Sequence, residues 1–278
     1  MNSIAPQPPP PLFTGASDQR FVIALILLGG VYVVLIVAML AADATFTSPG
    51  HLLRALQSPE IRHAIWLSLI SCSLTSLLSL WVAVPIGYGM SRIRFRGQSL
   101  VDALLDIPIV LPPLVVGLSL LILFQTPPGR LIERIMPVTY AVPAVVLAQF
   151  TVAAAFAVRT MRATFDQINP RQEQVALTLG CSRSQAFWLV VLPEARRGVL
   201  TAATLAWARS LGEFGPILVF AGATRMRTEV MSTTVFLELS VGNLEAAVAV
   251  SLLMVIAAFT VLLVIRRFGA GQNWNRNC

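Results

Sequence analysis

Long apolar stretches alternate with short polar segments along most of this chain. A helix needs about 20 predominantly apolar residues to cross a lipid bilayer, so each stretch of that length is predicted to be a membrane-spanning helix. The pattern therefore predicts an all-α integral membrane protein with six transmembrane helices. The predicted spans are Phe21–Ala42, Ala64–Met90, Leu104–Phe124, Tyr140–Met161, Gly198–Gly222 and Leu244–Ile265.

The second span has features that disturb a straight helix. It is rich in serine near its start and is predicted to be broken at Pro85 and Gly87. Small residues and hydroxyl groups permit close contact and hydrogen bonds between membrane helices, so this span is expected to pack tightly on a neighbour.

The third span carries one acidic residue and three prolines, Asp106, Pro108, Pro112 and Pro113. Each proline removes a backbone hydrogen bond, so the span is predicted to be bent or broken. Irregular backbone at membrane depth is tolerated where it is buried in protein or lines a water path. The span is therefore a candidate for lining a pore, and a bent packing helix is the alternative.

The composition agrees with a membrane protein. Of the 278 residues, 56% are hydrophobic and 12% are charged, and the mean hydropathy is +0.77. A soluble domain of this size cannot hide so much apolar surface, whereas a bilayer supplies an apolar solvent for it. In such a protein the net charge of +7 reports topology before it reports binding to nucleic acid.

Outside the spans, the sequence predicts a disordered proline-rich tail at residues 1–20 and a short tail at residues 269–278, with one domain from 21 to 268. The first tail lacks the basic start and short apolar core of a cleavable signal. The three scattered cysteines have no metal-ligand spacing and argue against a disulfide framework. No metal site and no catalytic residue is predicted, and the chain is not expected to be an enzyme.

One polar segment, Asn169–Pro193, has an internal order that a plain connector would not need. Asn169 can cap a helix that begins at Pro170, where the missing N–H costs nothing. Gly180 suits the left-handed turn that closes a helix. The first half of this loop is therefore predicted to be one short helix.

The second half of the loop has its own signals. Ser182 and Gln185 form a capping box that opens a second helix, predicted over Ala186–Leu192 and stopped by Pro193. A DNA-reading helix–turn–helix has this build, and so does a docking loop for a cytoplasmic partner. The segment alone leaves both interpretations open.

The arginines indicate on which side the loop lies. If the six spans alternate across the membrane, the side that holds the loop and both termini has about twice as many arginines as the other side. Cytoplasmic loops carry the basic excess, so the loop and both termini are predicted to be cytoplasmic. A DNA-reading unit tied to the bilayer at both ends could hardly reach a duplex, which favours the docking loop.

Two motifs resemble a known family. The loop reads EQVA at residues 173–176, glycine at Gly180 and LP at residues 192–193, which is similar to the EAA loop of the permease subunits of ABC importers. Residues 206–215, AWARSLGEFG, resemble the ARSLGEFG stretch of permeases for molybdate and of close relatives for sulfate and tungstate. The two motifs stand at the family's usual separation, and the likeness extends from about Ala64 to the sixth span.

The resemblance has two departures. Gln174 and Val175 occupy variable places of the EAA core. Pro216 follows the GEFG stretch where a small residue is more usual, so it is expected to affect how the fifth helix bends.

The resemblance implies the fold of type I ABC importer permeases, in which this segment is a two-helix coupling loop seated in a groove of a cytoplasmic ATPase. Packing against the chain's own helices is the alternative role for the two aromatic residues of the loop. The residues implied to seat the loop are Glu173, Ala176, Gly180, Phe187, Trp188 and Pro193. The candidates for the translocation path or its gate are Asp106, Pro112, Pro113, Arg209, Gly212, Glu213, Phe214 and Gly215.

Arg209 and Glu213 are four residues apart, hence on one helix face and able to pair. A charge at membrane depth normally faces the protein interior or a water path. Arg209 could offer positive potential to a passing dianion, or it could be half of a buried structural pair. The structural pair is favoured because Glu213 would cancel most of the attraction.

The implied machine lies in the inner membrane of a bacterial cell. It combines two permease subunits, expected to be two copies of this chain, with a pair of cytoplasmic ATPase subunits and an extracytoplasmic solute-binding protein. The chain has no GxxxxGK[ST] sequence, so ATP and Mg²⁺ are expected on the ATPase and no cofactor on this chain. Nucleic acid is not an expected partner.

The expected cargo is a tetrahedral oxyanion, most simply molybdate, with tungstate or sulfate close behind. Two alternatives stay open. The chain could be an ABC permease for another solute, such as a polyamine, iron or phosphate, or a channel or carrier that needs no ATPase.

Overall fold

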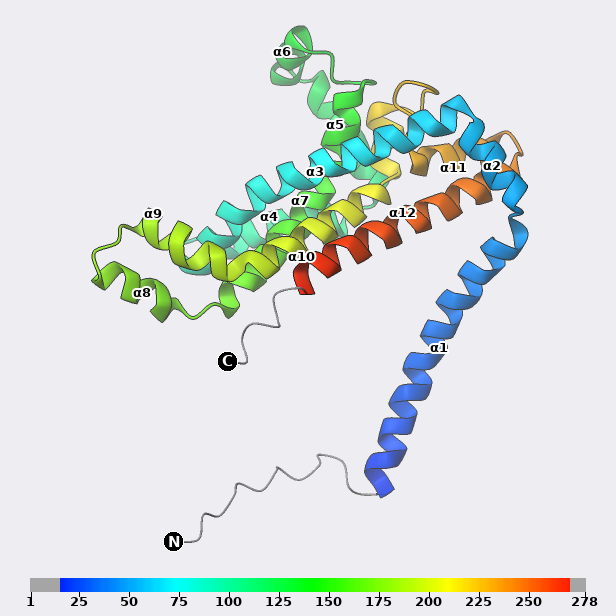
Figure 1. The fold of residues 1–278 in the computed structure, drawn as a ribbon. Helices are drawn as coiled ribbons and strands as arrows, with labels where there is room; N and C mark the ends of the chain where they lie inside the picture. The colour runs from blue at the N-terminus through cyan, green and yellow to red at the C-terminus, as the bar shows by residue number, and fades with distance from the viewer. Residues whose placement is uncertain (1–15, 271–278) are drawn as a thin grey trace. The chain divides into compact units, whose positions relative to one another are not determined.

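The computed structural model describes residues 16–270, and within this range the chain consists of helices and connecting turns with no strand (Figure 1). The expected all-α class is confirmed. Within the described range, residues 16–48 form one compact unit and residues 49–270 form another. The helices are α1 (Ala16–Phe46), α2 (Pro49–Gln57), α3 (Pro59–Arg92), α4 (Gln98–Val110), α5 (Pro113–Gln125), α6 (Pro127–Ile135), α7 (Val142–Gln167), α8 (Pro170–Thr178), α9 (Arg183–Ala186), the π-helical turn η1 (Phe187–Val191), α10 (Leu192–Leu211), the π-helical turn η2 (Ile217–Ala221), α11 (Met231–Ser240) and α12 (Leu244–Ala270).

The first unit contains α1, a helix of 31 residues that is long and apolar enough to cross a bilayer. It begins at Ala16, so the prediction of a disordered tail is wrong for residues 16–20, where no proline or glycine interrupts the helix. The rest of that predicted tail, residues 1–15, lies outside the described residues. At the other end α12 runs to Ala270, and residues 271–278 of the predicted short tail also lie outside the described range.

The second unit is built around α3, α7 and α10, which pack side by side (Figure 1). Their contact is close because small residues line it: Ala83, Ala157 and Ala202 are fully buried, one on each helix. The hydroxyl groups near the start of α3 bond across to other elements, as predicted. Ser76 Oγ donates to the Ala203 carbonyl oxygen at 2.9 Å, and Ser68 Oγ accepts from the Met231 N–H at 2.8 Å.

The predicted break of the second span is wrong, because α3 is one continuous helix through Pro85 and Gly87. A Cβ on Gly87 would lie 2.9 Å from the Cβ of Met161 on α7. Gly87 therefore serves the close approach of two helices. Close packing of this kind stabilises α3 at the place where Pro85 removes a backbone hydrogen bond.

The predicted bend of the third span is confirmed. α4 ends at Val110 and α5 begins at Pro113, and the two helices meet at an angle of 111°. Among the described residues, four helices are long and apolar enough to span a membrane, and this bent pair would make a fifth. The count of six spans stays a prediction.

The predicted fifth span, residues 198–222, is not one helix. α10 begins earlier, at Leu192, and ends at Leu211, and η2 starts only at Ile217. The helix carries Glu194, Arg196, Arg197 and Arg209, and it is not among the described helices that are apolar enough to span a membrane. The break contains the two glycines of the GEFG stretch and lies directly before η2, at Pro216, the residue expected to affect how this helix bends.

Candidate functional site

The loop between α7 and α10 begins as the sequence predicted. The Asn169 side chain accepts a hydrogen bond from the Arg171 N–H at 3.0 Å and caps α8, which has Pro170 in its first turn. Gly180 has a φ of +92°, the left-handed conformation that favours glycine, and nothing lies within 4 Å of where its Cβ would be. The turn therefore needs glycine for its backbone and not for space.

The capping box is also confirmed, with Ser182 N–H to Gln185 Oε1 at 2.8 Å and Gln185 N–H to Ser182 Oγ at 3.2 Å. The predicted stop at Pro193 is wrong, because the helix that starts at Arg183 continues through η1 into α10. In η1 the Leu192 N–H reaches back five residues to the Phe187 carbonyl oxygen. This wider turn lets Pro193, which has no N–H to donate, stand inside the helix.

Two of the predicted loop residues face the chain's own helices. Ala176 and Glu173 are both buried. The Tyr88 hydroxyl donates to Glu173 Oε1 at 2.6 Å, and Arg92 Nε lies 3.4 Å from Glu173 Oε2. The Glu173 carboxylate is thus held by the end of α3, and Tyr88 and Arg92 are contacts that the sequence analysis did not find.

The two aromatic residues of the loop point in different directions. Phe187 packs on Tyr88, with 4.8 Å between ring centroids, and on Phe165, whereas the Trp188 side chain is 61% exposed. Phe187 therefore takes the role of packing on the chain's own helices. The apolar part of the loop's outward face is formed by Val175, Leu179, Trp188 and Leu189, and polar side chains such as Arg171, Gln174 and Arg183 are exposed on the loop as well.

The second group of predicted residues meets where two helix breaks touch. We call residues 111–117 and 212–219 together the break junction. A Cβ on Gly215 would lie 2.8 Å from the Pro113 Cβ, and a Cβ on Gly117 would lie 2.8 Å from the Pro216 Cα. The bend between α4 and α5 and the break after α10 therefore lie directly against each other, as close as bare backbone permits.

Arg209 and Glu213 form the expected pair across the start of this break, with 2.5 Å between Arg209 Nη1 and Glu213 Oε2. The Glu213 side chain is 1% exposed and that of Arg209 is 30% exposed. The Arg209 guanidinium also lies 5.9 Å from the centroid of the Phe156 ring. The Glu213 carbonyl oxygen accepts a hydrogen bond from the Ser232 hydroxyl at 2.7 Å, which fixes the non-helical backbone. The Phe214 ring packs on that of Phe236, with centroids 5.3 Å apart and a tilt of 49° between the rings, and Gly212 has an ordinary negative φ.

The remaining candidate, Asp106, lies on α4 and pairs with Arg159 of α7. One turn away Asp102 pairs with Arg162, so the two helices are joined by two ion pairs. In the sequence, both arginines stand out only as part of the basic excess on one side of the membrane. The two aspartates are four residues apart on α4 and the two arginines are three apart on α7, so each set lies on one face of its helix. This spacing is the signal in the sequence that could have revealed the two ion pairs.

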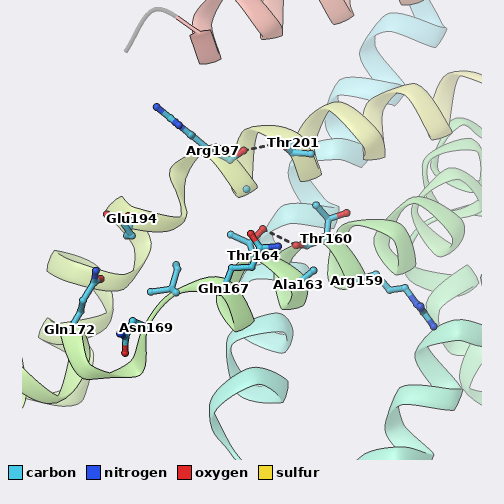
Figure 2. A pocket seen from close by; sticks show the side chains of 12 residues that line it. Arg159, Thr160, Ala163, Thr164, Gln167, Asn169, Gln172, Glu194, Arg197 and Thr201 are labelled. Atoms are coloured by element: carbon cyan, nitrogen blue, oxygen red, sulfur yellow. Dashed lines mark hydrogen bonds between the residues drawn. The ribbon is translucent and has the colours of Figure 1, made fainter. Parts of the chain in front are cut away.

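A polar groove of about 890 Å³ lies between α7 and α10 where they run into the loop. Figure 2 shows Thr160, Thr164 and Gln167 within it and the side chains of Arg159 and Arg197 extending away from it. Gly198 permits α10 to approach α7 closely beside this groove, because a Cβ there would overlap the Thr164 side chain. The threonine hydroxyls of the groove donate to carbonyl oxygens one turn back on their own helices. The amides of Gln167, Asn169 and Gln172 are the groups of the groove that can donate hydrogen bonds to an anion.

Two carboxyl groups outside the spanning helices have shifted pKa values. Hydrogen bonds from the Thr139 hydroxyl, and then from the backbone N–H groups of Thr139 and Val138, lower the pKa of Glu133. Burial raises the pKa of Glu229, although the Thr234 hydroxyl and Arg225 offset part of the effect. Among residues 16–270, no group of three His, Cys, Asp or Glu side chains could hold a metal ion.

Several proteins are similar to this chain in sequence or in fold. The sulfate transport system permease protein CysT of Salmonella typhimurium is 32% identical over 219 residues, which cover 76% of this chain and 79% of that protein. The probable molybdenum ABC transporter permease protein of Haloferax volcanii is 32% identical over 244 residues, which cover 88% of this chain and 89% of that protein.

Among solved structures, a bacterial ABC transporter involved in the import of the acidic polysaccharide alginate matches with a TM-score of 0.72 over 92% of this chain and 97% of that chain. At 18% identity this likeness shows the fold alone, and it confirms the expected type I permease fold. The family described as "Binding-protein-dependent transport system inner membrane component" matches residues 83–270. The chain therefore belongs to the family of inner membrane components of binding-protein-dependent transport systems.

Proposed function

We propose that this chain is the permease subunit of an ATP-driven importer for a tetrahedral oxyanion, most simply molybdate, with sulfate and tungstate as the other candidates. Two copies form the translocation path, a pair of separate ATPase subunits supplies the ATP and Mg²⁺ site, and an extracytoplasmic binding protein delivers the anion. The chain itself catalyses no reaction. The names of the sulfate and molybdenum relatives support the choice of cargo.

One observation carries the proposal. The loop between α7 and α10 presents four apolar side chains to the outside, among them Leu179, which is 80% exposed, while its polar carboxylate at Glu173 points inward. Exposed apolar patches mark sites of association, and an apolar loop face on a basic cytoplasmic surface fits a groove on a soluble partner. The ATPase pair is the partner that the family requires.

The loop is joined without interruption to α10, and α10 ends at the break junction. Closure of the ATPase pair on ATP would draw the two loops together and shift α7 and α10. The break junction would then change from closed to open, since a broken helix can hinge where a continuous helix cannot. The binding protein releases its anion into the opened path, and hydrolysis of ATP restores the first state.

The groove between α7 and α10 supplies polar groups that can contact the anion where the translocation path nears the loop. Its glutamine and asparagine amides can donate hydrogen bonds to an oxyanion, whereas its threonine hydroxyls already donate to carbonyl oxygens of their own helices. A few amide donors hold a dianion weakly, so that it can be released into the cytoplasm.

The experiment is reconstitution in proteoliposomes with the ATPase and the binding protein. Uptake of labelled molybdate should require ATP inside the vesicles, and unlabelled tungstate or sulfate should compete with it. Competition by phosphate, iron or a polyamine alone would change the cargo within the same family. Uptake that continues without any ATPase subunit would make the chain a channel or carrier and would contradict the proposal.

A further inference from the structure

The last turns of α3 contact the beginning, the middle and the end of the loop between α7 and α10. Two residues make these contacts, Tyr88 and Arg92, which stand four apart and so share one face of the helix. α3 ends at Arg92, so both lie at its very end.

The polar contacts bind the beginning and the middle of the loop. Arg92 Nη2 donates to the Ile168 carbonyl oxygen at 2.9 Å, directly before the loop starts. The two oxygens of Glu173 are divided between the Tyr88 hydroxyl at 2.6 Å and Arg92 Nε at 3.4 Å. The Arg92 and Glu173 side chains are 13% and 10% exposed. A pair shielded from water in this way keeps most of its electrostatic attraction.

The apolar contacts bind the two ends of the loop to each other. The Tyr88 ring stands edge-on to Phe165, with centroids 5.6 Å apart, and to Phe187, with centroids 4.8 Å apart. Phe165 lies in the last turn of α7 and Phe187 opens η1. The Tyr88 ring therefore touches the segments on both sides of α8, which also meet directly through Phe165 and Phe187, with ring centroids 6.4 Å apart.

We infer that Tyr88 and Arg92 clamp the loop onto α3 through Glu173, so that a force applied to the loop moves α3 together with α7 and α10. Glu173 is then a positioning residue that acts through α3 rather than a direct contact of the ATPase. This inference rests on the proposed function of the loop. Its physical basis is that the carboxylate is buried and both of its oxygens already have partners, which leaves the outward apolar face to meet the ATPase.

The test measures how many oxyanions are imported per ATP hydrolysed by the complete transporter in proteoliposomes, with molybdate as the probe. Glu173→Gln, Arg92→Gln and Tyr88→Phe should each lower this ratio by about fivefold or more, the lower end of common couplings between two sites. The ATPase should still copurify with each variant. Tyr88→Phe keeps the ring contacts and removes only the hydroxyl, so it separates the clamp from simple loss of packing.

Combining Glu173→Arg with Arg92→Glu reverses the ion pair and should restore part of the ratio, although the bond from Arg92 to the Ile168 carbonyl oxygen stays lost. A purely structural effect of either change would give no recovery. Arg171→Gln is the matched control, because Arg171 lies exposed on the same helix, α8, and its loss should leave the ratio unchanged. If the two α3 variants import normally while Glu173→Gln releases the ATPase, then Glu173 contacts the ATPase directly and the clamp is refuted. Failure of the proposed function looks different: the unaltered chain would then import no oxyanion or would bind no ATPase.

Discussion

The loop and the break junction lie before and after the same helix, α10, and they are held by different interactions. At the loop end, long side chains reach from α3 to Glu173, through a hydroxyl and a guanidinium. At the break junction, glycines let backbone rest on backbone, with Gly215 on Pro113 and Gly117 on Pro216.

The difference shows how one helix can carry a firm coupling at one end and a hinge at the other. Side-chain bonds are directional, and an equivalent pair of side chains can replace them. Backbone contacts contain no movable atoms, so any added group must push the helices apart. At the loop end, function should therefore recover when a bonded pair of side chains is exchanged as a whole, whereas the break junction should accept no added group.

The largest effect is expected from Arg209→Met. It leaves the carboxylate of Glu213, which is 1% exposed, without its partner. Removing one member of a buried ion pair typically costs about 3 to 5 kcal/mol, and the partial exposure of Arg209 favours the lower end. Thermal unfolding of the purified chain in nanodiscs should show the loss, together with a drop in uptake.

Glu213→Gln provides the control for this pair, because Arg209 can turn its charge toward water when the acid is gone. It should cost about 1 kcal/mol, the net worth of an ordinary hydrogen bond. Equal and small losses in both variants would mean that the pair does not hold the break junction. Normal stability with lost uptake in Arg209→Met would instead assign Arg209 to the translocation path.

The next effect is expected at the glycine contact. Gly117→Ala places a methyl group 2.8 Å from the Pro216 Cα and 3.0 Å from its carbonyl oxygen, both backbone atoms that cannot move aside. Overpacking of this kind costs about 1 to 3 kcal/mol. Unfolding in nanodiscs measures the cost, and ATP-driven uptake should fall with it.

Gly89→Ala on α3 is the matched control, because nothing lies within 4 Å of its Cβ position. It should stabilise the chain by about 0.5 to 1 kcal/mol, since alanine is the better helix former. Were Gly117→Ala as stable as Gly89→Ala, the close contact of the two breaks would not exist in the membrane.

Sequence reasoning could predict the contacts that are local. The cap at Asn169, the capping box of Ser182 and Gln185 and the left-handed turn at Gly180 each depend on residues two to four positions apart, so their signals lie in one short stretch. The bend in the third span was predictable for the same reason, because a proline disrupts the helix at its own position in the sequence.

The clamp on Glu173 was not predictable in this way, because Tyr88 stands 85 residues away from it. No rule of spacing links residues so far apart, and only the packing of α3 against the loop brings them together. The continuation of the helix through Pro193 was missed for another reason. A proline normally stops a helix, and the π-helical turn that accommodates it here has no reliable sequence signal.

A smaller effect is expected in the loop itself, from Gly180→Val. The position has free space around it and a φ of +92°, so the penalty is only that of a side chain in a left-handed conformation, about 1 to 2 kcal/mol. It should lower the number of oxyanions imported per ATP while the chain stays folded. Gly180→Asn should behave almost like the unaltered chain, because asparagine tolerates this conformation. Equal ratios in the two variants would contradict the requirement for the turn.

The smallest effect is expected from Arg159→Gln, which removes the ion pair between Arg159 and Asp106. The Arg159 side chain is 63% exposed and that of Asp106 is 27% exposed, whereas Glu213 in its pair is fully buried. Exposed pairs contribute about 0 to 1 kcal/mol, so unfolding in nanodiscs should hardly change. A loss of stability as large as that of Arg209→Met would mean that a second copy of the chain covers this ion pair and excludes water from it. Burial within one chain would then not predict which of the two ion pairs stabilises the protein more.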